Sequence, residues 1–286
     1  MRILVTGSRG MLGQDLMAIL PAGDGLFGVD IDECDITDPA QCRRVIDETT
    51  PDWIVNAAAF TAVDACETDR ETAMRVNGAG PENMAREARR TGARLLHVST
   101  DYVFDGLKRD PYLETDPVNP QTVYGASKLE GERRVISVLP EDHLIVRTSW
   151  LFGVHGGNFV ETILKAAAAG RDLRVVGDQV GCPTFAADLA QAIRELIQRN
   201  GRGIVHAANT GNTTWFAFAE YFVNRTFPGV SITPVTTDEY PRPAKRPPYS
   251  VLSTDRLKRI LGHPMPAWQD AVDRYLGLKY PERIKE

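Results

Sequence analysis

A tyrosine and a lysine four residues apart offer the first chemistry in this chain. Tyr124 and Lys128 stand in the run Tyr-Gly-Ala-Ser-Lys, and a helix would place both on one face, one turn apart. A free tyrosine has a pKa of about 10, and a nearby ammonium lowers that pKa by stabilising the phenolate. A tyrosine tuned in this way transfers a proton to or from a carbonyl or alcohol oxygen. Alone, the spacing is equally typical of a solvated helix face.

Three glycines near the N-terminus form a second motif. Gly7, Gly10 and Gly13 lie between an apolar run and a helical pattern. Glycines at this spacing permit a sharp turn, close approach of the backbone to a pyrophosphate, and close packing of helix on sheet. The helix N-terminus then offers free N–H groups to the phosphates. This context predicts a dinucleotide site, with contacts from Gly7, Arg9, Gly10, Met11, Leu12 and Gly13.

An acidic residue follows at the distance that ribose recognition requires. Asp30 ends the next predicted strand, about twenty residues on, where it would bond the adenosine ribose and repel a 2′-phosphate. Arg9 would instead attract that phosphate. The sequence therefore leaves NADH and NADPH open. Further predicted cofactor contacts are Asp35 and Ile36, at the adenine edge, and the small residues Ala57, Ala58 and Ala59.

The elements that must position these residues alternate in type. Predicted strands at 2–6, 26–30, 53–56, 94–99 and 143–147 alternate with predicted helices at 11–20, 39–48, 71–89 and 124–138. This order predicts an α/β fold, a Rossmann-like doubly wound parallel sheet with ligands at the carboxyl ends of its strands. Thr100 then lies at such an end.

The pattern weakens after about residue 150. Helices are predicted at 159–169 and 188–198, a strand at 204–208, and a loop or lid at the proline-rich stretch 241–248. We therefore predict an NAD(P)-binding Rossmann domain over 1–150, rejoined by about 186–210. Residues 151–286 mainly form a smaller C-terminal α/β domain.

Composition excludes several classes of function. The 286 residues include 33 Lys and Arg against 38 Asp and Glu, a net charge of −5, which gives no reason to bind nucleic acid or an anionic membrane. Apolar runs are too short for a membrane span or a signal peptide. Four cysteines without a Cys-x-x-Cys pair predict reduced thiols and no zinc site. We expect a cytoplasmic protein.

In order and spacing, these motifs resemble the extended branch of the short-chain dehydrogenase/reductase superfamily. The resemblance rests on the glycine triplet, Asp35-Ile36, the 56–59 run, Thr100 and the Tyr124–Lys128 pair. Longer strings resemble, more narrowly, the dTDP-4-dehydrorhamnose reductase family over nearly the whole chain. They are 56–64, 99–106, 147–153, 177–184 and 246–250.

The resemblance implies reduction of dTDP-4-dehydro-L-rhamnose to dTDP-L-rhamnose by hydride transfer from NADPH or NADH, in polysaccharide biosynthesis. It implies Thr100, Tyr124 and Lys128 as the catalytic group, with Tyr124 as proton donor and with Tyr124 and Lys128 also contacting the cofactor. It implies that residues 151–286 bind the sugar nucleotide. The implied substrate contacts are Thr100, Asp101, Tyr102, Tyr124, Trp150, Gln179 and Arg246.

Several alternatives stay open. A related 4-keto sugar-nucleotide reductase or an epimerase needs only the same catalytic group. A dehydratase needs a further acid where Tyr102 stands. A non-catalytic NADP-binding regulatory subunit, which binds the synthetase that makes S-adenosylmethionine, shares the sequence family, but it has no need of an intact catalytic group.

Metal and assembly are a separate question. Some members of the family form a homodimer bridged by Mg²⁺ through acidic side chains. Asp15 falls on the first such position, but Ala187 precedes Asp188 where an acidic pair is expected. We therefore place no metal ligand in the predicted site, and we leave Mg²⁺ and a homodimer open.

Overall fold

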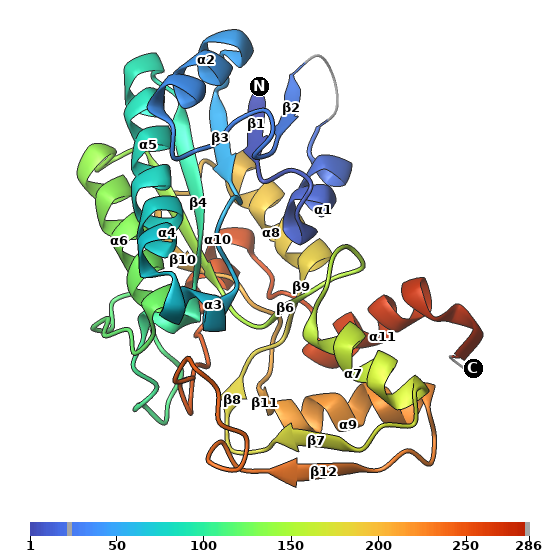
Figure 1. Ribbon diagram of the computed structural model, residues 1–286. Helices are drawn as coiled ribbons and strands as arrows, with labels where there is room; N and C mark the ends of the chain where they lie inside the picture. Colours follow the sequence, from blue (N-terminus) through green and yellow to red (C-terminus); the bar gives the residue numbers. More distant parts are fainter. Residues whose placement is uncertain (22–24, 284–286) are drawn as a thin grey trace.

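A parallel sheet of six strands forms the centre of the molecule (Figure 1). The computed structural model describes residues 1–21 and 25–283. The strand order is β10-β5-β4-β3-β1-β2, with every neighbouring pair parallel. The connection after β1 runs to β2, whereas the connection after β3 runs the opposite way along the sheet to β4, so a switch point lies between β1 and β3. The strands are β1 (Ile3–Thr6), β2 (Leu26–Val29), β3 (Trp53–Asn56), β4 (Arg94–Thr100), β5 (His143–Thr148) and β10 (Gly203–His206).

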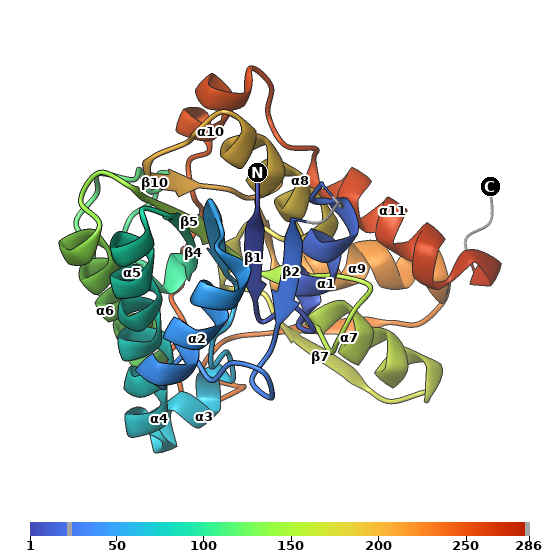
Figure 2. The same cartoon turned by 90° about the horizontal axis from the view of Figure 1, so that it is seen from above.

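Helices cover both faces of this sheet, as Figure 2 shows from above. Side chains alternate along a strand, so the neighbours Ile3 and Leu4 enter different buried clusters. The Ile3 cluster includes α1 (Met11–Ile19), α8 (Ala186–Gln198) and α10 (Asp255–Leu261). The Leu4 cluster includes α2 (Pro39–Thr49), α5 (Gly80–Thr91) and α6 (Val123–Val138). The predicted doubly wound sheet is confirmed.

The helix predicted over 71–89 is built from several pieces. After α3 (Val63–Thr68) come α4 (Arg70–Met74), the π-helical turn η1 (Arg75–Ala79) and α5. Asn77 in this turn is fully buried and donates to the Ser127 hydroxyl of α6 at 3.0 Å. A side chain at Gly131 of α6 would overlap the Asn77 carbonyl. The wider turn and the bare glycine therefore let α6 pack closely, which sets the position of Tyr124 and Lys128.

The C-terminal half adds a smaller α/β layer beyond the carboxyl ends of the sheet (Figure 1). Its buried cluster joins α7 (Phe159–Ala168), α9 (Trp215–Thr226), α11 (Trp268–Lys279) and the parallel pair β7 (Leu173–Val176) and β12 (Ile232–Val235). Two short pairs complete it, β6 (Leu151–Phe152) with β9 (Thr184–Phe185), and β8 (Val180–Gly181) with β11 (Thr213–Thr214). This confirms the predicted second α/β layer.

The chain crosses between the two layers more than once. Residues 186–210, predicted to rejoin the first domain, contain α8 and β10, and both belong to the central layer. Residues 241–248 form neither helix nor strand, as their prolines predict. The 150/151 boundary itself stays a prediction. Within the described ranges, every helix is too short or too polar to cross a membrane.

Candidate functional site

Two adjoining cavities lie at the carboxyl ends of β1, β3 and β4. The first has a volume of about 460 Å³ and the second about 410 Å³, and both are lined by Gly7, Gly10, Ala57 and Ala59. They occupy the switch point of the sheet, where doubly wound folds bind ligands. Every residue predicted to contact the cofactor lines one or both. These are Gly7, Arg9, Gly10, Met11, Leu12, Gly13, Asp30, Asp35, Ile36, Ala57, Ala58, Ala59, Tyr124 and Lys128.

The glycine loop is shaped by close backbone contacts. Gly7 has a positive φ of 71°, and a Cβ there would lie 2.7 Å from the Ala58 nitrogen. A Cβ at Gly13 would overlap the Gly7 carbonyl oxygen. Helix α1 begins at Met11 without a side-chain cap, so its first N–H groups are left for a ligand. This cradle fits the pyrophosphate of a dinucleotide.

Charge at the far end of the second cavity is mostly negative. Asp30 accepts hydrogen bonds from the Arg9 backbone N–H at 2.9 Å and the Ile31 N–H at 2.8 Å. The Arg9 guanidinium binds Glu33 at 2.6 Å and Asp32 at 3.0 Å. Two carboxylates therefore pair with the Arg9 guanidinium, and a third, that of Asp30, accepts from the Arg9 backbone.

Lys128 is buried beneath the first cavity, with 2% of its surface exposed. Its ammonium donates to the Val98 carbonyl at 2.7 Å. Burial lowers the pKa of Lys128 to about 8, against the opposing effect of the Glu132 carboxylate. At neutral pH the side chain is therefore mainly a cation, close to the pH at which it loses its proton.

Tyr124 stands one turn before Lys128 on α6 and lines the same cavity. Burial raises the pKa of its phenol, although the Thr100 hydroxyl acts in the opposite direction. The sequence predicts that the neighbouring ammonium lowers the pKa of Tyr124, but the effect of burial is larger and raises it. The phenol keeps its proton at neutral pH, so the side chain can act as a proton donor.

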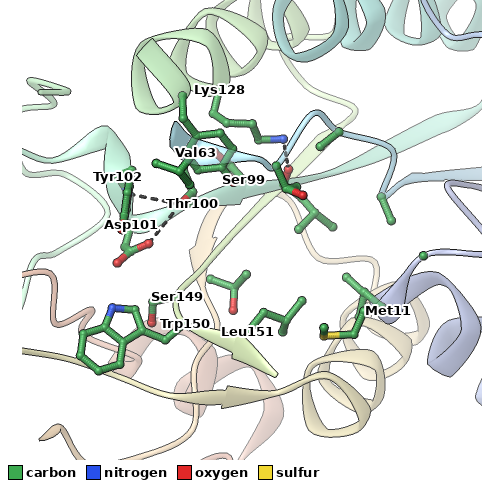
Figure 3. A pocket seen from close by; sticks show the side chains of 18 of the residues that line it. Met11, Val63, Ser99, Thr100, Asp101, Tyr102, Lys128, Ser149, Trp150 and Leu151 are labelled. Carbon is green, nitrogen blue, oxygen red and sulfur yellow. Dashed lines mark hydrogen bonds between the residues drawn. The ribbon is translucent and has the colours of Figure 1, made fainter. Parts of the chain in front are cut away.

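Thr100 and Asp101 form a hydrogen-bonded pair in the cavity wall (Figure 3). The Thr100 hydroxyl donates to Asp101 Oδ1 at 3.0 Å and accepts from the Tyr102 N–H at 3.2 Å. Asp101 is 2% exposed, and its Oδ2 has no partner among the described residues. Burial raises the pKa of Asp101 to about 6. The site therefore offers a buried carboxylate oxygen beside the Thr100 hydroxyl.

Trp150 lies across the first cavity from Thr100 and Lys128 (Figure 3). Its φ is +46°, which is strained for a residue with a bulky side chain. The indole stacks on Trp215 with ring centroids 3.5 Å apart, and a Cβ at Gly181 would collide with it. Trp215 also lines the cavity. The sequence does not indicate Trp215, because the aromatic run that begins α9 has no clear helical period.

Two predicted substrate residues lie apart from these cavities. Gln179 and Arg246 line neither of them. Gln179 donates to the Thr237 hydroxyl at 2.9 Å, and Arg246 makes a two-pronged ion pair with Asp64 at 2.8 and 3.1 Å. Asp64, a residue that the sequence analysis did not single out, thus ties the proline-rich loop to α3. The other predicted substrate contacts line the first cavity, namely Thr100, Asp101, Tyr102, Tyr124 and Trp150.

The acidic residues considered for Mg²⁺ have contacts within the chain. Asp188 accepts from Arg274 at 2.7 and 2.8 Å and from Asn209 at 2.7 Å. Asp15 is largely buried, burial raises its pKa, and His155 lies 3.8 Å away. No group of three metal-binding side chains occurs in the part of the chain that the structure describes. As from the sequence alone, Mg²⁺ and a homodimer stay open.

Comparison with known proteins agrees with this geometry. A family model described as RmlD substrate binding domain matches residues 1–279. The spore coat polysaccharide biosynthesis protein SpsK of Bacillus subtilis is 41% identical, over 96% of each chain. A dTDP-4-dehydrorhamnose reductase of Burkholderia thailandensis is 39% identical, over 95% of this chain and 97% of the relative.

A solved structure shows the same fold. The crystal structure of dTDP-4-dehydrorhamnose reductase from Bacillus anthracis in complex with NADP superposes with a TM-score of 0.92 and 36% identity. The match covers 96% of this chain and 98% of the other. Sequence and structure therefore agree along nearly the whole chain, and the chain belongs to the RmlD substrate binding domain family.

Proposed function

We propose that this protein reduces dTDP-4-dehydro-L-rhamnose to dTDP-L-rhamnose with NADPH or NADH. The observation that carries the proposal is the meeting of Thr100, Tyr124 and Lys128 in a cavity continuous with the glycine loop. The names of the B. thailandensis relative and the B. anthracis structure support the reaction, and the bound NADP of the latter supports the cofactor.

Three residues of the chain have separate roles in the reduction of the carbonyl group. The reduced nicotinamide supplies a hydride, which the C4 carbon of the keto sugar accepts. Tyr124 donates its phenolic proton to the C4 oxygen, so that a ketone becomes an alcohol. The Lys128 ammonium stabilises the phenolate that is left, and Thr100 turns its hydroxyl from Asp101 to hold the same oxygen.

The remaining predicted contacts bind the rest of the substrate in this proposal. Asp101, through its unpartnered Oδ2, accepts from a sugar hydroxyl, and Tyr102 and Trp150 face the apolar side of the deoxysugar. Gln179 and Arg246 contact the nucleotide from the C-terminal layer. Arg246 is held in place for this by Asp64.

Steady-state turnover tests the proposal. The purified chain is given dTDP-4-dehydro-L-rhamnose with NADPH or with NADH, and loss of the reduced-nicotinamide absorbance is followed while the product sugar is identified. We expect oxidation of the cofactor with formation of dTDP-L-rhamnose. An epimerase would convert the sugar without net oxidation, and a regulatory subunit would bind the cofactor without turnover. Either result would overturn the proposal.

A further inference from the structure

A line of buried polar side chains runs behind Lys128, on the side away from the cavity. Thr6 of β1, Asn56 of β3 and His97 of β4 are each at most 1% exposed. The Thr6 hydroxyl donates to Asn56 Oδ1 at 2.8 Å, and Asn56 Nδ2 lies 3.2 Å from His97 Nδ1. His97 Nε2 lies 3.5 Å from Lys128 Nζ. The line thus ends on the catalytic ammonium.

A backbone group fixes the orientation of the Asn56 amide. The Ala58 N–H donates to Asn56 Oδ1 at 3.2 Å, and a backbone N–H is able only to donate. The side-chain oxygen must therefore face Ala58 and Thr6, which leaves the NH₂ group facing His97. As that group is a donor, His97 Nδ1 is the acceptor and carries no proton.

The position of the one proton on the His97 ring follows from the burial of that ring. Burial, reinforced by the nearby Lys128 cation, holds the pKa of His97 well below its usual range, so the ring is neutral. A neutral imidazole carries one proton, and with Nδ1 acting as acceptor that proton is on Nε2. The Nε2–H group therefore points toward Lys128 Nζ.

The N–H group of His97 that faces Lys128 changes the balance between the ammonium and the neutral amine forms of the lysine. The ammonium has only donors, whereas the neutral amine has a lone pair that is able to accept from Nε2–H. The one hydrogen bond within 3 Å that Lys128 makes among the described residues is to the Val98 carbonyl. His97 therefore favours the neutral amine and opposes the cation.

Other groups that face Lys128 do not cancel this effect. On α6 these are Tyr124, which keeps its proton, and Glu132, which favours the cation. Glu132 is itself neutralised by Arg147 of β5, whose guanidinium donates to it at 2.7 and 2.9 Å, and it also accepts from the Ser99 hydroxyl of β4. The carboxylate of Asp101 lies in the cavity wall beside Thr100.

We propose that His97, fixed by Asn56 with its proton on Nε2, is a positioning residue that makes Lys128 easier to deprotonate. It acts through Lys128 and touches neither substrate nor cofactor. The proposal deepens the function proposed above and rests on it for its kinetic consequence. The proton position on His97 is a property of the protein alone.

Nitrogen NMR of the ¹⁵N-histidine-labelled full chain tests the proton position directly. The His97 signals are identified by elimination, as those that remain after the signals of His143, His155, His206 and His263 are each assigned from a His→Gln variant of that residue. We expect Nδ1 to be unprotonated and Nε2 to be protonated, with no change between about pH 5.5 and 8.5. A proton on Nδ1, or a ring that becomes cationic in this range, would overturn the proposal. This readout does not need turnover, so a failure of the proposed function is seen separately.

The pH profile of turnover tests the effect on Lys128. The glutamine oxygen in His97→Gln is free to accept from the ammonium, so we expect the alkaline fall in kcat to move upward by about one pH unit. The matched control is His263→Gln, an exposed histidine paired with Glu195, and we expect it to leave the profile unchanged. A folded His97→Gln variant with an unmoved profile would contradict the proposal, and if the variant fails to fold the NMR result on the native chain decides.

Discussion

Burial leaves Tyr124 and Lys128 in the proton states that reduction needs at neutral pH. The phenol of Tyr124 is held protonated, because burial raises its pKa. The ammonium of Lys128 survives burial with a pKa of about 8. A reductase must give a proton to oxygen, so a protonated phenol beside a cation suits reduction.

The pKa of Lys128 predicts how turnover depends on pH. The cationic form exists below the pKa and is lost as the pH rises through about 8. We expect kcat to fall as the pH rises through 8. Below about pH 7 we expect kcat to stay level until Asp101, whose pKa is about 6, takes up its proton. Steady-state rates between about pH 6 and 10 check this. A kcat that does not fall up to pH 10 would show that the cation is not required.

Removing the Tyr124 hydroxyl tests its role as proton donor. We expect Tyr124→Phe to lower kcat by about 10²- to 10⁴-fold, the usual contribution of general acid catalysis, and to leave the dissociation constant of NADPH within a few-fold. Turnover and fluorescence titration of the cofactor measure the two effects. Tyr240→Phe, at an exposed tyrosine outside both cavities, serves as the control. Turnover of Tyr124→Phe close to that of the native chain would assign the proton to another group.

The carboxylates around Arg9 influence how the chain discriminates between NADPH and NADH. Glu33 binds the guanidinium at 2.6 Å, so Arg9 is not free to attract a 2′-phosphate. We expect Glu33→Gln to raise kcat/KM for NADPH relative to NADH several-fold, since exposed charge pairs contribute only modestly. Glu48→Gln, on the exposed side of α2, should change neither value. An unchanged ratio in Glu33→Gln would mean that Arg9 does not meet the ribose.

Sequence indicates which site residues lie together where spacing along the chain reports spatial proximity. Tyr124 and Lys128 are neighbours on one helix, and the glycines are neighbours in one loop, so the sequence shows them directly. Trp215 and His97 reach the site only through tertiary packing. Nothing in their local pattern distinguishes them from core residues.

The elements that carry the site depend on close approach of one backbone to another. Gly7 fits against Ala58, and Gly13 fits against the Gly7 carbonyl. The sequence predicted this loop, because strand, glycines and helix follow each other within a few residues. It did not predict the π turn η1 or helix α9. The turn is set by the packing of Asn77 against α6, and α9 is apolar on more than one side, which hides the helical period.

Replacing Gly13 by alanine tests the close backbone packing of the glycine loop. We expect Gly13→Ala to weaken cofactor binding at least tenfold and to lower the unfolding free energy by about 1–3 kcal/mol, because the new methyl group overlaps backbone. Gly277→Ala is the matched control, since a side chain on that α11 glycine meets no atom within 4 Å of its Cβ. There we expect a gain of up to about 1 kcal/mol. Equal effects at both positions would contradict the packing argument.

At the scale of the whole molecule, the site forms where the two layers meet. Thr100 and Lys128 come from the sheet layer, and Trp150 comes from the segment between the two layers (Figure 3). Trp215 comes from the C-terminal layer. Asp64 and Arg246 add an ion pair between α3 and the proline-rich loop. The sequence predicted two layers of α/β structure and helix α7 of the second layer, but not helices α9 and α11 or the strands of that layer. The short pairs β6–β9 and β8–β11 form only between distant segments.

Transfer of an isotope label shows whether the chain delivers hydride from the nicotinamide to C4 of the keto sugar. The chain is given dTDP-4-dehydro-L-rhamnose with NADPH or NADH deuterated at C4 of the nicotinamide, and the product is analysed by NMR. We expect dTDP-L-rhamnose with deuterium at C4 of the sugar, and loss of this product in Tyr124→Phe. Deuterium at another carbon, or an unreduced sugar in the presence of a folded chain with bound cofactor, would contradict this expectation.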